Sequence, residues 1–150
     1  MKLEDEIKQS IFKNEYQKAN INIAFTASWL SQHAAKALKP YGISIQQFNI
    51  LRILRGMHPK PATIKLLTER MIDKTSNASR LVDKLILKQL VDRRECPMDR
   101  RQVDILITEQ GLGLLEKASD DLETNMLHYM SGISTAEAAT INQLLDKLRK

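Results

Sequence analysis

Cysteine, proline and glycine are scarce in this chain. Its 150 residues include one cysteine, four prolines and five glycines. A single cysteine excludes a framework of intramolecular disulfides and is typical of a reducing compartment. So few glycines and prolines argue against a loop-rich or all-β fold, because these residues mark turns. A hydrophobic content of 43% is nevertheless enough for the core of one domain.

The chain also lacks long apolar segments. No apolar run approaches the length of about 18 residues that a membrane-spanning helix needs. The first six residues are mostly charged, which is not the pattern of a secretory signal peptide. We therefore expect a cytoplasmic protein with a single domain over residues 1–150 and no membrane partner.

Patterns for catalysis and for metal binding are missing as well. The sequence contains no Gly-rich phosphate loop, no nucleophile elbow and no paired cysteine and histidine. His33, His58 and His128 are scattered, without a carboxylate or cysteine partner at ligand spacing. The sequence thus predicts neither an enzyme nor a metal or cofactor site.

Positive charge, in contrast, is concentrated in one part of the chain. Residues 52–101 hold 13 Lys/Arg and 6 Asp/Glu, whereas the rest holds 10 and 12, and the whole chain has a formal net charge of +5. A local excess of this kind is typical of a surface that meets phosphate groups. A basic surface that only contacts solvent would give the same numbers.

Apolar residues recur at helical spacing over residues 4–38, which predicts a long helix that could break near residues 20–22. Pro40 and Gly42 end it. This helix has little polar cover on its apolar side, so we expect it to pack on a second subunit. At the other end of the chain, Thr108 is predicted to cap a helix that reaches about residue 130, and Ser134 a final helix.

Between these terminal helices the pattern predicts three shorter helices and a hairpin. Ser44 and Gln47 form a capping box, Thr63 is the next N-cap, and either Asp73 or Thr75 caps the third helix. After Leu90 the apolar period changes from 3.6 to 2. This change predicts a strand over residues 103–107 that pairs with residues 91–95 across a loop of residues 96–101.

The third helix, predicted over residues 75–89, has one apolar and one polar face. Ala78, Leu81, Val82 and Leu85 would face the core, which leaves small polar and basic side chains outside. A helix of this kind suits a DNA major groove, where arginine can bind guanine and asparagine can bind adenine. The predicted contact residues are Thr75, Ser76, Asn77, Ser79, Arg80 and Lys84. Taken alone, these residues are more simply explained by a capped surface helix with a polar outer face, because Ser and Asn near a helix start are ordinary caps.

The hairpin carries a group of arginines close to its turn. A narrow minor groove attracts arginine, and Asp99 is expected to hold the side chain of Arg101 extended by a charge-assisted hydrogen bond. A solvated basic turn is the simpler alternative. The combination of this helix and this hairpin indicates DNA binding more specifically than either part alone. The predicted hairpin contacts are Arg93, Arg94, Asp99, Arg100 and Arg101.

These segments resemble the multiple-antibiotic-resistance regulator (MarR) family of winged-helix transcription factors. The similarity runs over about residues 20–130. It rests on the motifs GISIQQF at 42–48, LRIL at 51–54, SRLVDKL at 79–85, LVDRR at 90–94, DRR at 99–101 and ITEQGL at 107–112. The fold class that follows is mainly α with a small β-hairpin wing. It is a winged helix-turn-helix lobe at about 44–108, with dimerisation helices at about 1–40 and 109–150.

The resemblance implies a homodimer that binds double-stranded DNA at a pseudopalindrome and acts as a repressor. It also implies a small aromatic or anionic effector between the dimer helices and the lobe. By this analogy Phe25, Trp29, His33 and Phe48 are candidates for the effector pocket, although core packing explains Phe48 equally well. The redox-sensing branch of the family carries its cysteine near the N-terminus, so Cys96 in the wing is expected to be a bystander.

Two other functions fit a winged helix. A protein-interaction adaptor would carry an acidic or apolar outer face on the third helix, and here that face carries Arg80 and Lys84. A non-sensing architectural DNA binder stays open, because an effector pocket leaves no sharp motif. The sequence does not identify the operator, the effector or the regulated genes.

Overall fold

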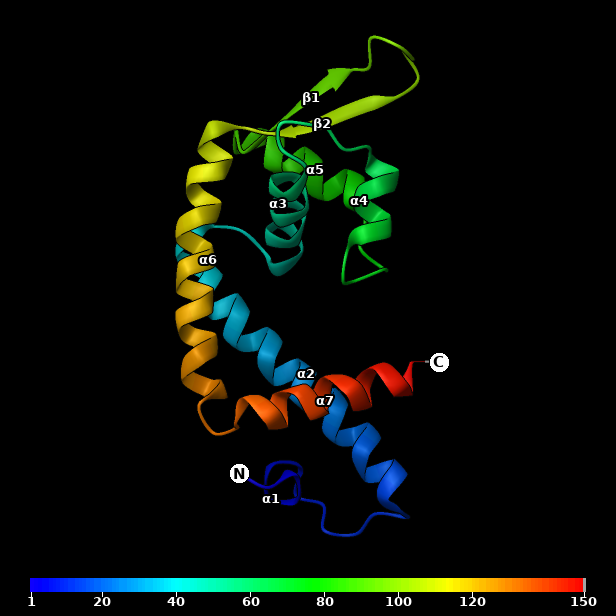
Figure 1. Cartoon of the computed structure of the whole chain (residues 1–150), viewed down its shortest axis with the longest axis vertical. Helices are drawn as coiled ribbons and strands as arrows, with labels where there is room; N and C mark the ends of the chain where they lie inside the picture. The colour runs from blue at the N-terminus through cyan, green and yellow to red at the C-terminus, as the bar shows by residue number, and fades with distance from the viewer. Residues whose placement is uncertain (150) are drawn as a thin grey trace.

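The computed structural model describes residues 1–149, and its helices and hairpin confirm the predicted winged-helix fold class (Figure 1). The hairpin projects from one end of the molecule, and both chain termini lie in the half away from it. The long helix α6 runs along one side and joins the two halves. The elements in order are α1 (Leu3–Ile7), α2 (Glu15–Leu38), the 3-10 helix η1 (Lys39–Tyr41), α3 (Ile45–Met57), α4 (Ile64–Arg70), α5 (Ala78–Leu87), β1 (Val91–Glu95), β2 (Val103–Ile107), α6 (Glu109–Met130) and α7 (Thr135–Leu148).

Four predicted N-caps are confirmed. Each of these hydroxyl oxygens accepts a hydrogen bond from the backbone N–H three residues later, which satisfies a donor that the helix itself leaves free. Two of the four also form complete capping boxes, in which the third residue's side chain bonds back to the cap. The caps are Ser44 of α3, Thr63 of α4, Thr108 of α6 and Ser134 of α7.

The N-terminal helix differs from the prediction. It is not continuous over residues 4–38, and the break lies at residues 8–14 rather than near 20–22. Lys8 adopts the left-handed conformation with φ of 56° and ends α1, while the Asn14 side chain accepts from the Gln17 amide and starts α2. Asn20 and Asn22 are exposed within α2. Their amides therefore reach solvent and do not compete with the helix backbone.

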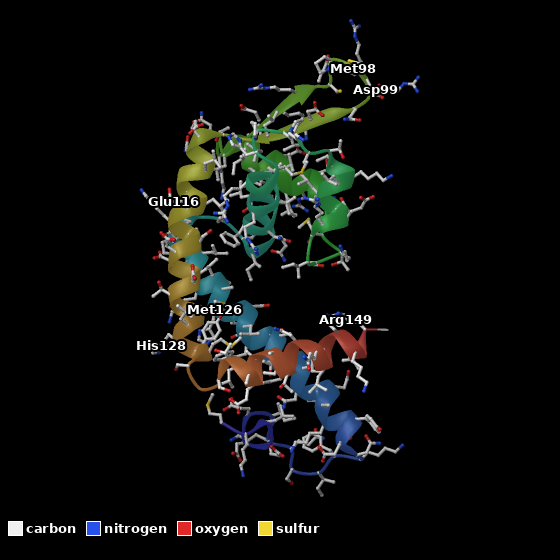
Figure 2. The ribbon with its side chains drawn as sticks, in the orientation of Figure 1. Met98, Asp99, Glu116, Met126, His128 and Arg149 are labelled. Carbon is white, nitrogen blue, oxygen red and sulfur yellow. The ribbon has the colours of Figure 1, made fainter. Side chains whose placement is uncertain are left out.

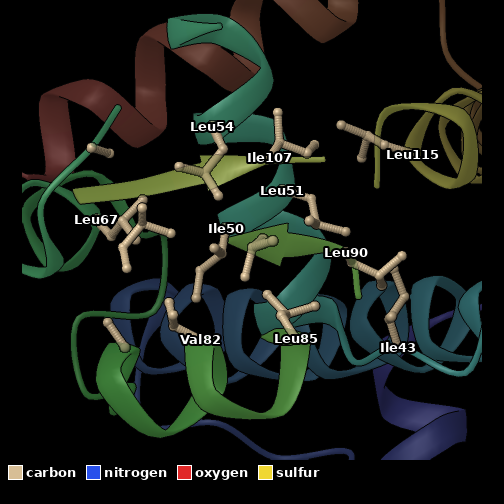
Figure 3. Packing of buried hydrophobic residues seen from close by; sticks show 14 of the residues in the cluster. Ile43, Ile50, Leu51, Leu54, Leu67, Val82, Leu85, Leu90, Ile107 and Leu115 are labelled. Atoms are coloured by element: carbon tan, nitrogen blue, oxygen red, sulfur yellow. The ribbon is translucent and has the colours of Figure 1, made fainter. Parts of the chain in front are cut away.

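The hydrophobic core lies in the lobe, around α3 (Figure 3). Ile50 and Leu51 of α3 are fully buried, and so are Val82 and Leu85 of α5, as predicted for that helix. Burial of an aliphatic side chain of this size stabilises a fold by about 1.5–3 kcal/mol. The core also includes Leu38, at the end of α2, and two residues of α6. The lobe is thus built partly from the helices that leave it.

The sheet is an antiparallel pair in which Val91 lies opposite Ile107 and Glu95 opposite Val103. Ile105 and Ile107 are buried, in agreement with the predicted period of two. An additional bridge was not predicted: Ala62 exchanges both backbone hydrogen bonds with Ile105, at 2.9 and 2.8 Å. This bridge fixes the connection between α3 and α4 against the base of the hairpin.

The helices of the other half keep many apolar side chains at the surface. α7 has no buried residue, and Leu144 and Leu148 in it are 61% and 66% exposed. Met126 and Met130 near the end of α6 are each 40% exposed. Across residues 1–149, no helix combines the length and the apolar character that crossing a membrane requires.

α6 begins in close contact with the end of α5. The Thr108 amide donates to the Leu90 carbonyl at 3.1 Å, and the Thr108 hydroxyl donates to the Gln89 carbonyl at 2.8 Å. Gly111, one turn into α6, lies directly against the Leu90 backbone. A Cβ at Gly111 would collide with the Leu90 carbonyl oxygen and lie 2.8 Å from Cγ1 of Ile107. The junction therefore requires glycine at this position.

The first prediction concerns this junction. We expect Gly111→Ala to lower the free energy of unfolding by about 1–3 kcal/mol, because the methyl group forces α6 away from the backbone behind it. Gly113→Ala is the matched control in the same helix, since a Cβ there meets no atom within 4 Å. It should be neutral or stabilising by up to about 1 kcal/mol, the ordinary helix preference for alanine. Urea unfolding measures both, and a gain in stability for both variants would contradict the close contact.

Candidate nucleic-acid interface

The recognition helix α5 is shorter than predicted. It begins at Ala78 rather than at residue 75 and ends at Leu87 rather than at residue 89, and its N-cap is Asn77, whose side chain accepts from the Arg80 amide at 3.1 Å. The prediction that Asp73 or Thr75 caps this helix is therefore wrong. Met71 and Ala78, on the two sides of the turn that leads into α5, are buried, at 1% and 3% exposed.

Asp73 has a different task in that turn. Its carboxylate accepts from the Thr75 hydroxyl at 2.7 Å and from the Thr75 amide at 3.0 Å. These hydrogen bonds, first that of the hydroxyl and then that of the amide, hold the pKa of Asp73 below its usual value, because they stabilise the ionised form. Asp73 thus orders the turn that leads into α5.

The outer face of α5 agrees with the prediction except at Ser76. Ser79, Arg80 and Lys84 are exposed, opposite the buried Val82 and Leu85. Ser76 lies before the helix and is half-buried, with its hydroxyl covered. It is therefore not presented on the outer face as predicted.

Five of the six residues predicted for this helix line one open hollow of about 360 Å³ at its N-terminal end. Gln46, in the first turn of α3, lines the same hollow, and sequence reasoning did not single it out. The capping box beginning at Ser44 was the available signal, because it placed the polar side chain of Gln46 in the first turn of α3. The lining residues are Gln46, Asp73, Thr75, Ser76, Asn77, Arg80, Leu81 and Lys84.

The tip of the hairpin is ordered by Asp99, though not in the predicted manner (Figure 2). The carboxylate of Asp99 accepts from the backbone amide of Arg101 at 2.9 Å, and the carbonyl of Asp99 accepts from Gln102 at 3.0 Å. The expected bond to the Arg101 side chain is not formed. A short aspartate side chain reaches the amide two residues later most easily, and so it shapes the turn while the guanidinium stays free.

The cations of the surface fall into two groups. Arg93, predicted as a wing contact, forms an ion pair of 2.6 Å with Asp83 of α5, and Arg94 lies 3.8 Å from Asp92. Arg93 thus connects the base of the wing with the recognition helix. The other exposed cations of α5 and the wing form no ion pair with a carboxylate of residues 1–149. They are Arg80, Lys84, Arg100 and Arg101.

The candidates for the effector pocket lie in different parts of the structure. Trp29 and His33 pack with Tyr129 of α6, with ring centroids 4.2 to 5.4 Å apart. Phe25 and Trp29 line a hollow beneath the N-terminal segment, whereas Phe48 packs on the core of the lobe. Tyr129 was missed as a neighbour of Trp29, because the contact joins residues 100 positions apart. In the described part of the chain, Cys96 is a half-buried free thiol and no three metal-ligating side chains cluster.

Comparison with known proteins agrees with this arrangement. Residues 41–102 match the MarR family model. The transcriptional repressor MprA of Escherichia coli K12 is 30% identical over 122 residues, which cover 81% of this chain and 69% of MprA. A MarR mutant from E. coli, solved with operator DNA, superposes with a TM-score of 0.79 at 22% identity, covering 93% of this chain and 99% of that one. The organohalide-sensing regulator RdhR, solved with 2,4-dichlorophenol, superposes with a TM-score of 0.83 at 19% identity. The match covers 94% of this chain and 85% of RdhR.

The two likenesses to solved structures concern the fold, and the sequence match to MprA extends over most of both proteins. Together with the winged lobe and its basic outer face, they lead to one conclusion: the chain belongs to the MarR family of DNA-binding transcription regulators.

Proposed function

We propose that this protein is a homodimeric repressor that recognises a pseudopalindromic operator and releases it when a small aromatic effector binds. The proposed DNA binding rests on one observation, a set of exposed cations on α5 and the wing. Arg80 and Lys84 on α5 and Arg100 and Arg101 on the wing are exposed and form no ion pair with a carboxylate of residues 1–149. DNA phosphates and base edges would supply their partners. The operator complex of the E. coli MarR mutant, which has the same fold, supports this proposal.

Within this proposal the residues have different roles. Arg80 reads a base edge, because a guanidinium can bind guanine with two hydrogen bonds. Asn77 contributes its amide N–H groups, since its oxygen already caps α5. Lys84 and Arg94 contact phosphates, and Arg101 enters the minor groove from a turn that Asp99 orders. Thr75 and Ser76 line the same hollow as Arg80, and Ser79 is exposed on the outer face of α5. Arg93 supports the wing through its ion pair with Asp83.

The dimer is supported by the apolar side chains that the terminal helices leave exposed. Ile23 of α2, Met126 and Met130 of α6, and Leu144 and Leu148 of α7 are between 40% and 66% exposed. A second copy of the chain would bury them, as the dimerisation regions predicted at about 1–40 and 109–150 require. Two lobes held in this way meet major grooves about one helical turn, roughly 34 Å, apart.

For the effector we propose an aromatic molecule that binds beside Trp29, His33 and Tyr129. These rings join α2 to the end of α6, so a ligand there would act on the same helices that set the distance between the lobes. The dichlorophenol bound to RdhR supports an aromatic ligand for a protein of this fold. A ligand lowers DNA affinity to the extent that it prefers a dimer with the wrong spacing.

The experiment that tests the DNA-reading function is a fluorescence-anisotropy titration in a salt series. It compares DNA from upstream of this protein's own gene with a scrambled duplex. We expect one dimer to prefer the upstream DNA by at least about 10³, with affinity falling steeply as salt rises. Equal affinities for the two duplexes would mean either that the upstream DNA lacks the operator or that binding is non-specific. Selection of bound genomic fragments would decide between these two explanations. A failure to bind either duplex at low salt would contradict the DNA-reading function and favour a protein-interaction adaptor.

Arg80→Ala should cost about 1–3 kcal/mol of binding free energy on the operator and much less on scrambled DNA, because it removes a base contact. Lys117→Ala is the charge-matched control, since Lys117 is exposed on α6 away from the recognition helix. The measurement is the dissociation constant of each variant on both duplexes. Equal losses on both duplexes would make Arg80 a phosphate contact instead.

Arg101→Ala should weaken binding about tenfold more on operators with A/T-rich flanks than on G/C-rich ones, because the narrow groove of A/T-rich DNA attracts arginine. Arg100→Ala removes the same charge from the neighbouring position and serves as the control. Anisotropy on paired duplexes that differ only in their flanks gives the ratio. A ratio for Arg101→Ala that equals the control's would rule out insertion of Arg101.

A further inference from the structure

Beyond its N-terminal junction with Gln89 and Leu90, α6 is attached to the DNA lobe by a buried apolar stripe with one polar contact on each side. Leu115 and Ala118 of α6 are both fully buried in the lobe core. The Tyr41 hydroxyl donates a hydrogen bond to the Asp121 carboxylate, and the Arg55 guanidinium donates to the Ser119 hydroxyl at 3.4 Å. At 3.6 residues per turn, Ser119 and Asp121 lie on opposite sides of the stripe. An apolar stripe alone lets a helix roll, whereas contacts on both sides oppose rolling.

Tyr41 belongs to a short connection that is held at both ends. The connection, residues 39–42, runs between Leu38 and Ile43, which are both buried in the core. Gly42 follows Tyr41 in the left-handed conformation, with φ of 65°, and its carbonyl accepts from the Lys88 ammonium group at the end of α5. The connection therefore contacts α6 through Tyr41 and the recognition helix through Gly42.

The Tyr41–Asp121 bond is the stronger of the two flanking contacts, because its acceptor is a carboxylate. This carboxylate raises the pKa of Tyr41, so the phenol remains a donor throughout the physiological pH range. The ring of Tyr41 packs against the core. Replacement by phenylalanine thus removes the hydroxyl and keeps the packing.

We propose that Tyr41 and Asp121 are positioning residues that fix the roll of α6 against the lobe and so make the dimer selective for one spacing between operator half-sites. The inference rests on the proposed dimeric DNA binding. One base pair more or less between the half-sites shifts them by about 3.4 Å and rotates them by about a tenth of a turn. A lobe that cannot roll on α6 cannot turn its recognition helix to match the displaced half-site. A lobe that can roll matches part of the displacement.

The test uses the full-length protein and an operator selected by the wild type from random DNA, with one base pair inserted or deleted between the half-sites. Anisotropy gives the ratio of each dissociation constant to that of the unaltered operator. Tyr41→Phe should reduce this ratio about tenfold, and Asp121→Ala should do the same. Asp121→Asn keeps an oxygen that accepts from the phenol and should retain most of the wild-type ratio. Tyr16→Phe, at a tyrosine that is 88% exposed on α2, is the control.

The spacing ratio separates positioning from a loss of stability, because general destabilisation weakens binding to all spacers alike. A wild-type ratio in Tyr41→Phe, whatever its absolute affinity or melting temperature, would overturn the inference and leave the proposed function intact. If the wild type selected no sequence from the random pool, the proposed function would fall, and this inference with it.

Discussion

The contact between the start of α6 and the Leu90 backbone is the constraint on which the rest of the lobe depends. Three elements meet there: α5 ends just before Leu90, β1 begins just after it, and α6 begins at Glu109. Thr108 caps α6 through the Gly111 amide and at the same time donates to the Gln89 carbonyl. A single threonine therefore joins the end of the recognition helix to the helix that leaves the lobe, and Gly111 permits the close approach.

This constraint explains why the reading surface can carry unpaired charge. Arg80 and Lys84 are one helical turn apart on the exposed face of α5, where like charges repel and cost a few tenths of a kcal/mol. The buried face of α5 and its attachment to β1 and α6 offset that cost easily, since each buried aliphatic side chain contributes several times as much. The ion pair of Asp83 with Arg93 adds a polar link between helix and wing without using the cations at the reading surface.

The parts of this fold that sequence could predict are those that depend on near neighbours. Ser44, Thr63, Thr108 and Ser134 were identifiable as caps because a cap bonds three residues ahead. Asn77 caps α5, whereas Asp73 bonds to Thr75 within the preceding turn. The sequence offers a cap-type side chain at 73, 75, 76 and 77, and local preference alone does not choose among them. The contacts of Tyr41 with Asp121 and of Trp29 with Tyr129 join residues 80 and 100 positions apart. No spacing rule reaches that far, so the links from the lobe to α2 and α6 could not be predicted. The outer face of α5 depends on helical periodicity and was largely predictable.

The terminal helices give a reason to expect that reading and dimerisation are coupled. α7 is 14 residues long and has no buried residue in the single chain, and an isolated helix of that length is marginal in water even with a capping box. In the proposed dimer its exposed leucines would be covered by the partner, so its stability would come from association. α6 carries core residues of the lobe at Leu115 and Ala118 and exposed methionines at its far end. Any displacement of that end by a ligand or by the partner would therefore be transmitted along one helix to the lobe, where the contacts of Asp121, Ser119 and Gly111 resist independent movement.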